Sequence, residues 1–251
     1  MKQSPLTTFT NHSDDYQKYR PGYPEAIITY LESNIGLDKE KSVADVGAGT
    51  GIFTELLLKN NYHVQAIEPN QEMRIKAEVL LDTYPDLKII NGTAENTGLE
   101  AGKVDLITVA QSFHWFDPEK TREEFKRIAR PGAYVLLIWN ILQDKSSFLQ
   151  KYHALKNNYA KRRPHLEKID NAKIARLLEP CKTISQEIYH SRSLHEQELL
   201  GYFRSSSYSP LEGEEGYPEL VEELHKIFEE HQQNGTVKLE YDAKLYLAPL
   251  L

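Results

Sequence analysis

Cysteine and long apolar runs are the first two features that this sequence lacks. Cys181 is the single cysteine among 251 residues, so an internal disulfide is excluded and a reducing compartment is favoured. No run approaches the roughly 20 apolar residues of a membrane helix, and residues 1–16 are polar, without the apolar centre of a signal peptide. We therefore expect a cytoplasmic protein that has no membrane partner.

Positive charge is also in short supply. The chain has 30 Lys and Arg residues against 37 Asp and Glu residues, so its net charge is −7 and no basic surface for nucleic acid is expected. No set of Cys, His or carboxylate residues has the spacing of metal ligands, and we predict no metal site. The remaining composition is that of a globular chain with one core and a small appended lobe, and we expect a monomer or a homodimer.

Three alternating glycines stand out against this ordinary background. Residues 43–51 read Val-Ala-Asp-Val-Gly-Ala-Gly-Thr-Gly and pass directly into an amphipathic segment, residues 52–59. The order is that of a strand, a tight turn and a helix. Glycines are needed where the backbone takes positive φ values and where a side chain would block a ligand lying against the main chain. The pattern predicts a turn that binds a nucleotide-like ligand, although a glycine turn without a ligand is the simpler alternative.

The glycine spacing and two acidic residues narrow the ligand class. A dinucleotide fingerprint, G-x-G-x-x-G, requires a glycine where the chain has Ile52, so the pattern here is G-x-G-x-G. Asp45 precedes the glycines, and Glu68 ends the next apolar run, 21 residues after Gly47. A carboxylate at the end of a parallel strand can accept two hydrogen bonds from a ribose diol.

This combination resembles the first two motifs of class I S-adenosylmethionine-dependent methyltransferases, D/E-x-G-x-G-x-G followed by an acidic residue after the second strand. The resemblance implies S-adenosylmethionine as the cofactor. It implies that the cofactor is bound by Tyr19, Asp45, Gly47, Ala48, Gly49, Gly51, Glu68, Pro69, Met73, Ala94, Glu95, Ala110 and Gln111. Met73 could instead face the core, and Ala94 and Glu95 could belong to a plain surface loop.

Two further segments resemble small-molecule methyltransferases of the family that includes trans-aconitate methyltransferases. They are Tyr-Gln-Lys-Tyr-Arg-Pro-Gly-Tyr-Pro at residues 16–24 and Ala-Gln-Ser-Phe-His-Trp-Phe-Asp at residues 110–117. The resemblance implies that the first segment covers the cofactor and that the second forms the rim of the active site. It implies catalytic roles for His114 and Arg20, and substrate contacts from Tyr16, Trp115 and Ser207. The alternatives are that the tyrosines only pack, that His114 only closes the pocket wall and that the serines form a local turn.

Alternating strands and helices predict an α/β fold. Strands are expected at residues 43–46, 64–67, 87–90, 104–110, 133–140, 184–189 and 236–247. They predict a doubly wound, seven-stranded, mostly parallel sheet of the Rossmann-like type. The resemblance to class I methyltransferases implies that the last strand lies antiparallel between the fifth and sixth. We expect four regions: a lid and helix (1–40), the cofactor-binding core (41–140), a helical cap insertion (141–181) and the last two strands (182–251).

The sequence therefore predicts an S-adenosylmethionine-dependent methyltransferase that acts on a small molecule, with a carboxylate or a hydroxyl as the acceptor. A nicotinamide-dependent oxidoreductase is the first alternative, because it shares the fold and the acidic residue after the second strand. A non-catalytic protein that binds S-adenosylmethionine is the second.

Overall fold

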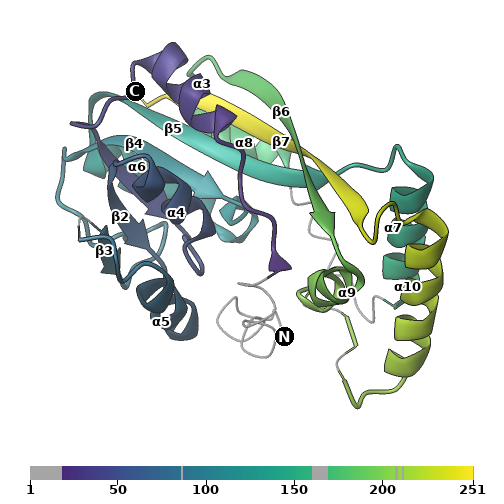
Figure 1. Ribbon diagram of the computed structural model, residues 1–251. Coiled ribbons are helices and arrows are strands. Elements are labelled where there is room, and N and C mark those ends of the chain that lie inside the picture. Colours follow the sequence, from purple (N-terminus) through teal and green to yellow (C-terminus); the bar gives the residue numbers. More distant parts are fainter. Residues whose placement is uncertain (1–18, 86, 160–168, 207–208, 211, 251) are drawn as a thin grey trace. The chain divides into compact units, whose positions relative to one another are not determined.

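The structure is a computed structural model that describes residues 19–85, 87–159, 169–206, 209–210 and 212–250 (Figure 1). Two predicted substrate contacts, Tyr16 and Ser207, lie outside the described residues. Within the described part, no helix is both long enough and apolar enough to cross a membrane.

The strands form one seven-stranded sheet in the described part of the chain, in the order β3-β2-β1-β4-β5-β7-β6. Their bounds are β1 Ser42–Val46, β2 His63–Ile67, β3 Leu87–Ile90, β4 Val104–Ala110, β5 Ala129–Leu142, β6 Ile184–Leu194 and β7 Val237–Pro249. Strand β1 pairs in parallel with β2 and with β4, β2 pairs in parallel with β3, and β4 with β5. The predicted fold class is confirmed.

Strand β7 runs antiparallel to β5. The backbone amide of Leu250 donates to the carbonyl of Ala133 at 2.8 Å, and the amide of Gln143 donates to the carbonyl of Glu240 at 2.9 Å. Partner numbers therefore fall along β5 as they rise along β7, which is the signature of antiparallel pairing. The predicted insertion of the last strand between the fifth and the sixth is confirmed.

The helices of the described residues are α3 Ala26–Ile35, α4 Ile52–Lys59, α5 Gln71–Leu80, the 3₁₀ turn η1 Phe113–Trp115, α6 Pro118–Ile128, α7 Ser147–Tyr159, α8 Asn171–Leu178, α9 Glu196–Arg204 and α10 Tyr217–His231. Of these helices, α5, α6 and α8 begin at a residue whose side chain caps the first turn. The Asn70 side chain accepts hydrogen bonds from two amides of α5, and Asp117 caps α6 just before Pro118. A proline at the first helical position costs no hydrogen bond there, and this explains the start of α6.

The end of α6 differs from the prediction. Pro131 and Gly132 in the sequence predict that the helix after Pro118 runs to Arg130, but α6 ends at Ile128 and β5 begins at Ala129. Ala129 is paired with Val104, the first residue of β4. This pairing begins β5 two residues before Pro131, so the helix has already ended when the chain reaches the proline. A partner distant in sequence therefore overrides the local signal.

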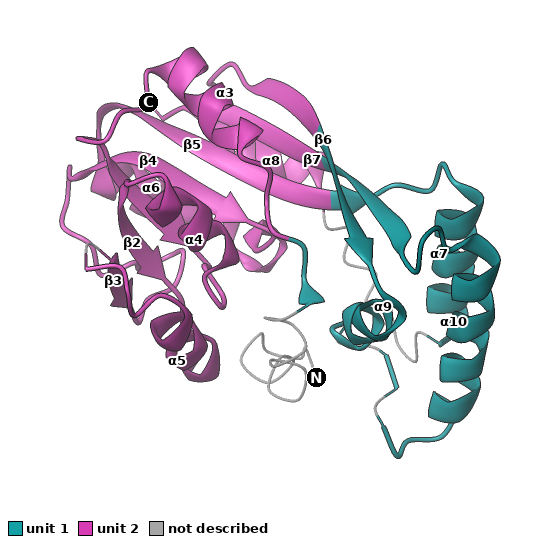
Figure 2. Ribbon diagram, viewed as in Figure 1, with its two compact units in different colours: residues 1–21, 141–166, 189–242 teal, residues 22–140, 167–188, 243–251 magenta. Residues whose placement is uncertain are grey.

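The chain divides into two compact units (Figure 2). Unit 2 consists of residues 22–140, 167–188 and 243–251, and unit 1 consists of residues 1–21, 141–166 and 189–242. The expected cap insertion, residues 141–181, is divided between them, because α7 belongs to unit 1 and α8 to unit 2. The four expected regions otherwise stay a prediction.

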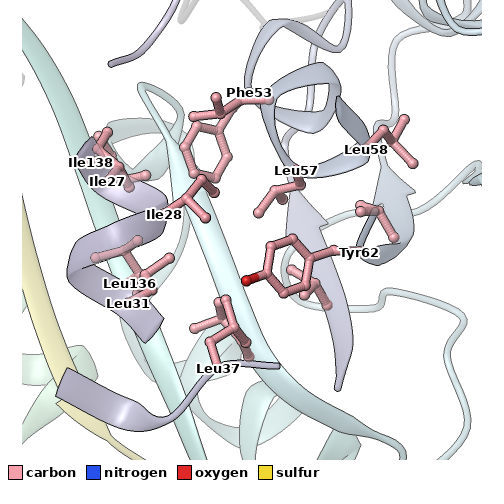
Figure 3. Close-up of a cluster of buried hydrophobic side chains, with 14 of the residues drawn as sticks. Ile27, Ile28, Leu31, Leu37, Phe53, Leu57, Leu58, Tyr62, Leu136 and Ile138 are labelled. Atoms are coloured by element: carbon pink, nitrogen blue, oxygen red, sulfur yellow. The ribbon is translucent and has the colours of Figure 1, made fainter. Parts of the chain in front are cut away.

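Unit 2 has an apolar cluster on each face of its sheet, and β5 contributes to both. Leu136 and Ile138 belong to a cluster with residues of α3 and α4, which Figure 3 shows in close-up. Val135, Leu137 and Trp139 belong to a second cluster, with residues of α6 and α8. Successive residues of a strand face opposite sides, so the central strands are covered by helices on both faces.

Unit 1 has a core of its own, built from three helices and the first half of β7. Its buried residues come from α7, α9, α10, β7 and the last residue of β6, and they are Phe148, Leu149, Tyr152, Leu155, Leu194, Leu199, Tyr202, Phe203, Leu220, Leu224, Phe228, Val237, Leu239 and Tyr241. The share of tyrosine gives this core hydroxyl groups that the core of unit 2 largely lacks.

Candidate functional site

The glycine turn between β1 and α4 has the backbone that the sequence predicts. Gly47, Gly49 and Gly51 have φ values of +71°, +60° and +86°, a region that residues with a Cβ rarely adopt. The space beside each glycine differs. A Cβ on Gly47 would lie 2.5 Å from the Ser112 Oγ, and one on Gly51 would lie 2.7 Å from a methyl group of Leu81.

Gly49 differs from Gly47 and Gly51 because a Cβ there would meet no atom of the described residues within 4 Å. Packing therefore requires glycine at positions 47 and 51, whereas the main chain at Gly49 faces open space. This is the part of the turn against which a ligand can lie.

The carboxylate of Glu68 lies beside Gly49. Its Oε2 accepts a hydrogen bond from the Gly49 amide at 2.9 Å, and its Oε1 accepts one from the Asn70 amide at 2.9 Å. Burial raises the pKa of Glu68, whose exposed fraction is 9%, and the two amide bonds and the charge of Arg74 oppose that rise. The structure thus brings together the glycine turn and the acidic residue that the sequence placed at the end of β2.

Asp45 lies beneath the turn and is fully buried. Its carboxylate accepts hydrogen bonds from the Thr54 hydroxyl at 2.6 Å and from the Thr108 hydroxyl at 2.9 Å. The pKa of Asp45 is raised to about 6. Burial is the largest cause of the rise and the charge of Glu68 adds to it, whereas the two threonine bonds oppose it. Asp45 therefore ties β1 to α4 and β4, which positions the glycine turn; its predicted contact with the cofactor stays a prediction.

The residues that we predict to contact adenine follow the ends of β2 and β3. Met73 and Ala94 are buried, at 5% and 3% exposure. Glu95 is partly exposed, and its Oε1 accepts a hydrogen bond from the Asp117 amide at 2.9 Å. Through this bond Glu95 joins the loop after β3 to the start of α6.

The rim after β4 carries the predicted catalytic histidine. Ser112 follows Ala110 and Gln111, and its hydroxyl donates to the carbonyl of Val46 at 3.0 Å, which anchors the rim to the end of β1. The His114 ring lies 4.8 Å from the Trp115 ring, centroid to centroid, at 42°.

Lys173 of α8 holds this rim from a distant part of the sequence. Its ammonium group donates to the His114 carbonyl at 3.0 Å and lies 5.4 Å from the centroid of the Phe113 ring. Burial lowers the pKa of Lys173, although the charge of Asp170 opposes this. The sequence did not predict the contact of Lys173 with the rim, nor the hydrogen bonds from the two threonines to Asp45. Thr108, a polar residue within an apolar strand, was the available signal.

Tyr19 and Arg20 belong to unit 1, where both contact the α9 region. The Tyr19 carbonyl accepts a hydrogen bond from Arg192 at 3.1 Å, and the Arg20 guanidinium donates to the Ser205 carbonyl at 3.0 Å. A Cβ on Gly201 of α9 would clash with the Tyr19 ring. These two predicted site residues are therefore held in fixed positions within unit 1.

The described residues form two further groupings of charged side chains, of which the first includes Glu95. In unit 2, a cleft of about 460 Å³ is lined by Glu95, Lys120, Glu123, Glu124 and Arg127. In unit 1, Glu196, His225 and Glu229 bring their ligand atoms within 4.8 Å of one another, a grouping that their spacing in the sequence did not reveal. His225 and Glu196 are bonded at 2.5 Å and largely exposed, so we interpret this second group as a surface ion pair.

Parts of this chain are similar in sequence to known proteins. Residues 44–137 match the family model of the methyltransferase domain. The chain is 30% identical to an uncharacterized methyltransferase-like protein of Schizosaccharomyces pombe, over 65% of this chain and 63% of that protein. It is 34% identical to an uncharacterized methyltransferase of Mycobacterium tuberculosis, over 54% of this chain and 53% of that protein. The chain thus spans between half and two thirds of these curated relatives.

Solved structures show the same fold over nearly the whole chain. A candidate type II methyltransferase from Anaeromyxobacter dehalogenans matches with a TM-score of 0.73 and 20% identity, covering 93% of this chain and 99% of that one. An S-adenosylmethionine-dependent methyltransferase from Aquifex aeolicus matches with a TM-score of 0.54 and 18% identity, over 96% of this chain and 99% of that one. The resemblance to the trans-aconitate family is not specified by these matches and stays a prediction.

Proposed function

From the methyltransferase domain and the class I methyltransferase fold that this chain carries, we propose that the protein transfers a methyl group from S-adenosylmethionine to a small-molecule acceptor. The observation that carries the proposal is the position of Glu68 beside Gly49, where a carboxylate and an open stretch of main chain meet at 2.9 Å. The names of the relatives support the same activity.

The residues of this edge fit an adenosyl cofactor. A ribose offers two hydroxyl donors, and Glu68 is an acceptor held at the correct strand end by Asn70. Gly49 leaves room for the amino acid chain of the cofactor, because among the described residues no atom lies within 4 Å of the position that a Cβ would take. We propose adenine contacts from Met73, Ala94 and Glu95, and contacts to the amino acid part of the cofactor from Ala110 and Gln111.

When bound, S-adenosylmethionine supplies an electrophilic methyl group on a sulfonium centre. The protein has to align the acceptor with that group and to exclude water, and this requires few catalytic side chains. The Asp45 bonds to two threonines serve the alignment, because they fix the glycine turn against β4. Ser112 serves it from the other side, through its bond to Val46.

We propose that the rim after β4 receives the acceptor. His114 and Trp115 are both partly exposed there. For an O–H acceptor, the His114 imidazole would accept the proton that the acceptor loses. A carboxylate acceptor needs no base, and the role that the sequence resemblance implies for Arg20 would be to form paired hydrogen bonds with a carboxylate.

The two alternative functions meet specific obstacles. A nicotinamide-dependent oxidoreductase needs a glycine at the position of Ile52, and Ile52 opens α4 as an ordinary helical residue. A protein that only binds the cofactor would not need His114 and Trp115 at the rim. We further propose that the protein acts in the cytoplasm, because the single Cys181 suits a reducing compartment. We propose a monomer or a homodimer as its oligomeric state.

Thermal unfolding with candidate ligands tests the cofactor. A ligand that binds the native state raises the melting temperature in proportion to its affinity and concentration. S-adenosylhomocysteine should raise it, NADH should not, and the Glu68→Ala variant should show a smaller rise with S-adenosylhomocysteine. A rise with NADH alone would disprove the proposal.

An acceptor screen then tests the substrate class. Small carboxylic acids and matched alcohols are incubated with S-adenosylmethionine, and the release of S-adenosylhomocysteine is measured. With a carboxylate acceptor, Arg20→Lys should raise KM and His114→Ala should leave kcat nearly unchanged. With a hydroxyl acceptor, His114→Ala should lower kcat by about 10²-fold or more, the usual contribution of a general base.

A further inference from the structure

Gln111 has an unusual backbone at the end of β4. Its φ of +63° lies in the left-handed region, and the other non-glycine residues with positive φ in the described ranges are Asn61 and Asn234. Asparagine tolerates this region because its short amide bonds to the local backbone, whereas glutamine gains no such compensation. Strained residues of this kind persist only where the surroundings hold them, and they gather at functional sites.

Strand β5 holds Gln111 in this conformation. The Gln111 amide donates to the Ile138 carbonyl at 2.9 Å, and its side-chain Nε2 donates to the Asn140 carbonyl at 3.2 Å. Carbonyl groups two residues apart in a strand point in the same direction, so both donors of Gln111 meet one edge of β5. The left-handed turn is what allows the side chain to lie back along that edge.

Asn140 binds a second segment through its own side chain. Its Nδ2 donates to the carbonyl of Gly22 at 3.0 Å. Gly22 lies between Pro21 and Pro24, whose rings fix φ and leave this stretch few conformations. One hydrogen bond at Gly22 therefore determines much of the path by which the chain enters α3.

The next residue ties the same segment to the glycine turn. The Tyr23 ring meets the Phe53 ring edge to face, at 5.0 Å between centroids and 84° between planes. Phe53 is buried in the first turn of α4, two residues after Gly51. Residues 22–23 are thus fixed at one end to β5 and at the other to the helix that follows the glycines.

We infer that Asn140 is a positioning residue of the cofactor-binding edge, which couples the strained Gln111 to the segment that begins α3. Its backbone carbonyl holds Gln111, and its side-chain amide holds Gly22. This double role requires a donor of this length: aspartate cannot donate to a carbonyl, and serine is too short to reach one. The inference rests on the proposed function, and it adds a residue that neither the glycine motif nor the acidic motif includes.

Asn140→Asp separates the two contacts, because it keeps the backbone carbonyl and replaces the donor with a second acceptor. Asn140→Ala removes the donor without adding a charge, so it serves if Asn140→Asp does not fold. Asn34→Asp is the matched control, since the Asn34 Nδ2 also donates to a backbone carbonyl, that of Tyr30, at the far end of α3.

Two measurements on the full chain decide the matter. The Ile27 and Ile28 amides donate to the carbonyls of Pro24 and Glu25, where the anchored segment enters α3. In protein without ligand, hydrogen exchange of these two amides should become at least about tenfold faster in Asn140→Asp and stay unchanged in Asn34→Asp, because opening of the anchored segment becomes easier. Calorimetry should show affinity for S-adenosylhomocysteine reduced by about tenfold in Asn140→Asp alone, with a melting temperature close to that of the wild type.

Unchanged exchange in Asn140→Asp and Asn140→Ala would overturn the inference, because the anchored segment would not depend on Asn140. Faster exchange with unchanged affinity would also overturn it, since the anchor would then serve only packing. A wild-type protein that does not bind S-adenosylhomocysteine would instead refute the proposed function. The exchange measurement does not involve the cofactor, so the two failures are distinguishable.

Discussion

The Gly49 amide donates a hydrogen bond of 2.9 Å to the Glu68 carboxylate, across the gap between the ends of β1 and β2. The two residues are 19 positions apart in the chain. Their contact unites the two features that define the candidate site, an open stretch of main chain and a largely buried carboxylate acceptor. Burial raises the pKa of this carboxylate, because removal from water disfavours its ionised form.

We predict that Glu68→Ala weakens binding of S-adenosylhomocysteine by about 1–3 kcal/mol, the range for lost hydrogen bonds to a charged acceptor. Glu68→Gln should cost less, because one acceptor oxygen remains. Titration calorimetry measures both. Glu72→Gln, an exposed acid in the first turn of the neighbouring α5, is the control and should bind as the wild type does. Equal affinity in all three variants would mean that Glu68 only caps the glycine turn.

The glycines of the turn should divide into two kinds when each is replaced by alanine. Gly47→Ala forces a Cβ against Ser112 and should lower stability by several kcal/mol, whereas Gly49→Ala should cost only the strain of its positive φ, about 1 kcal/mol. Gly49→Ala should nevertheless lose most of its affinity for S-adenosylhomocysteine, because the new methyl group would occupy the space in which we propose that the ligand lies. Urea unfolding and calorimetry separate the two effects.

Gly132→Ala is the control for backbone strain alone. Gly132 has a φ of +83°, no atom of the part of the chain that the structure describes lies within 4 Å of its Cβ position, and it is remote from the turn in the sequence. Its alanine variant should lose about as much stability as Gly49→Ala and keep full affinity. If Gly49→Ala also keeps full affinity, the ligand does not lie against Gly49.

The glycine turn shows how far sequence alone could lead. The glycine motif predicted a turn with positive φ values, and the alternation of strands and helices predicted the fold, because both patterns depend on residues that are neighbours in the sequence. The early start of β5 and the contact of Lys173 with His114 were not predicted, because each depends on partners that only the folded sheet brings together. Asn140 escaped for the same reason, since its partner Gly22 lies 118 residues away.

Asp45 should make stability depend on pH in a defined window. Its pKa rises from the ordinary 3.8 to about 6 on folding, so the folded state retains the proton more strongly than the unfolded state does. The resulting stabilisation is fully present below about pH 4 and is lost as the pH rises through about 6. It amounts to about 3 kcal/mol, since each tenfold change in proton affinity is worth about 1.4 kcal/mol.

Asp45→Asn tests this directly, because asparagine keeps the shape and does not ionise. Relative to this variant, the wild type should be more stable at pH 4 than at pH 7, and the change should fall between pH 4 and 6. Urea unfolding over that range measures it. Asp82→Asn, at an exposed position, controls for the loss of a surface charge. A difference between wild type and Asp45→Asn that stays constant with pH would show that Asp45 is ionised throughout.

Gly201 offers a test of Tyr19 that leaves the tyrosine itself in place. Gly201 lies inside α9, where alanine favours the helix by about 1 kcal/mol over glycine. A Cβ at this position would displace the Tyr19 ring, so the helix gain is offset in the wild-type background and should appear in a Tyr19→Ala background. Unfolding of the four proteins in this double-mutant cycle measures the coupling between the two residues.

The same four proteins decide whether Tyr19 contributes to cofactor binding, as the sequence resemblance implies. Gly201→Ala should weaken binding of S-adenosylhomocysteine when Tyr19 is present, because the ring is pushed from the place where Arg192 holds its backbone. It should have no further effect once Tyr19 is already alanine. If Gly201→Ala binds the ligand as tightly as the wild type in both backgrounds, Tyr19 serves only to pack the chain against α9.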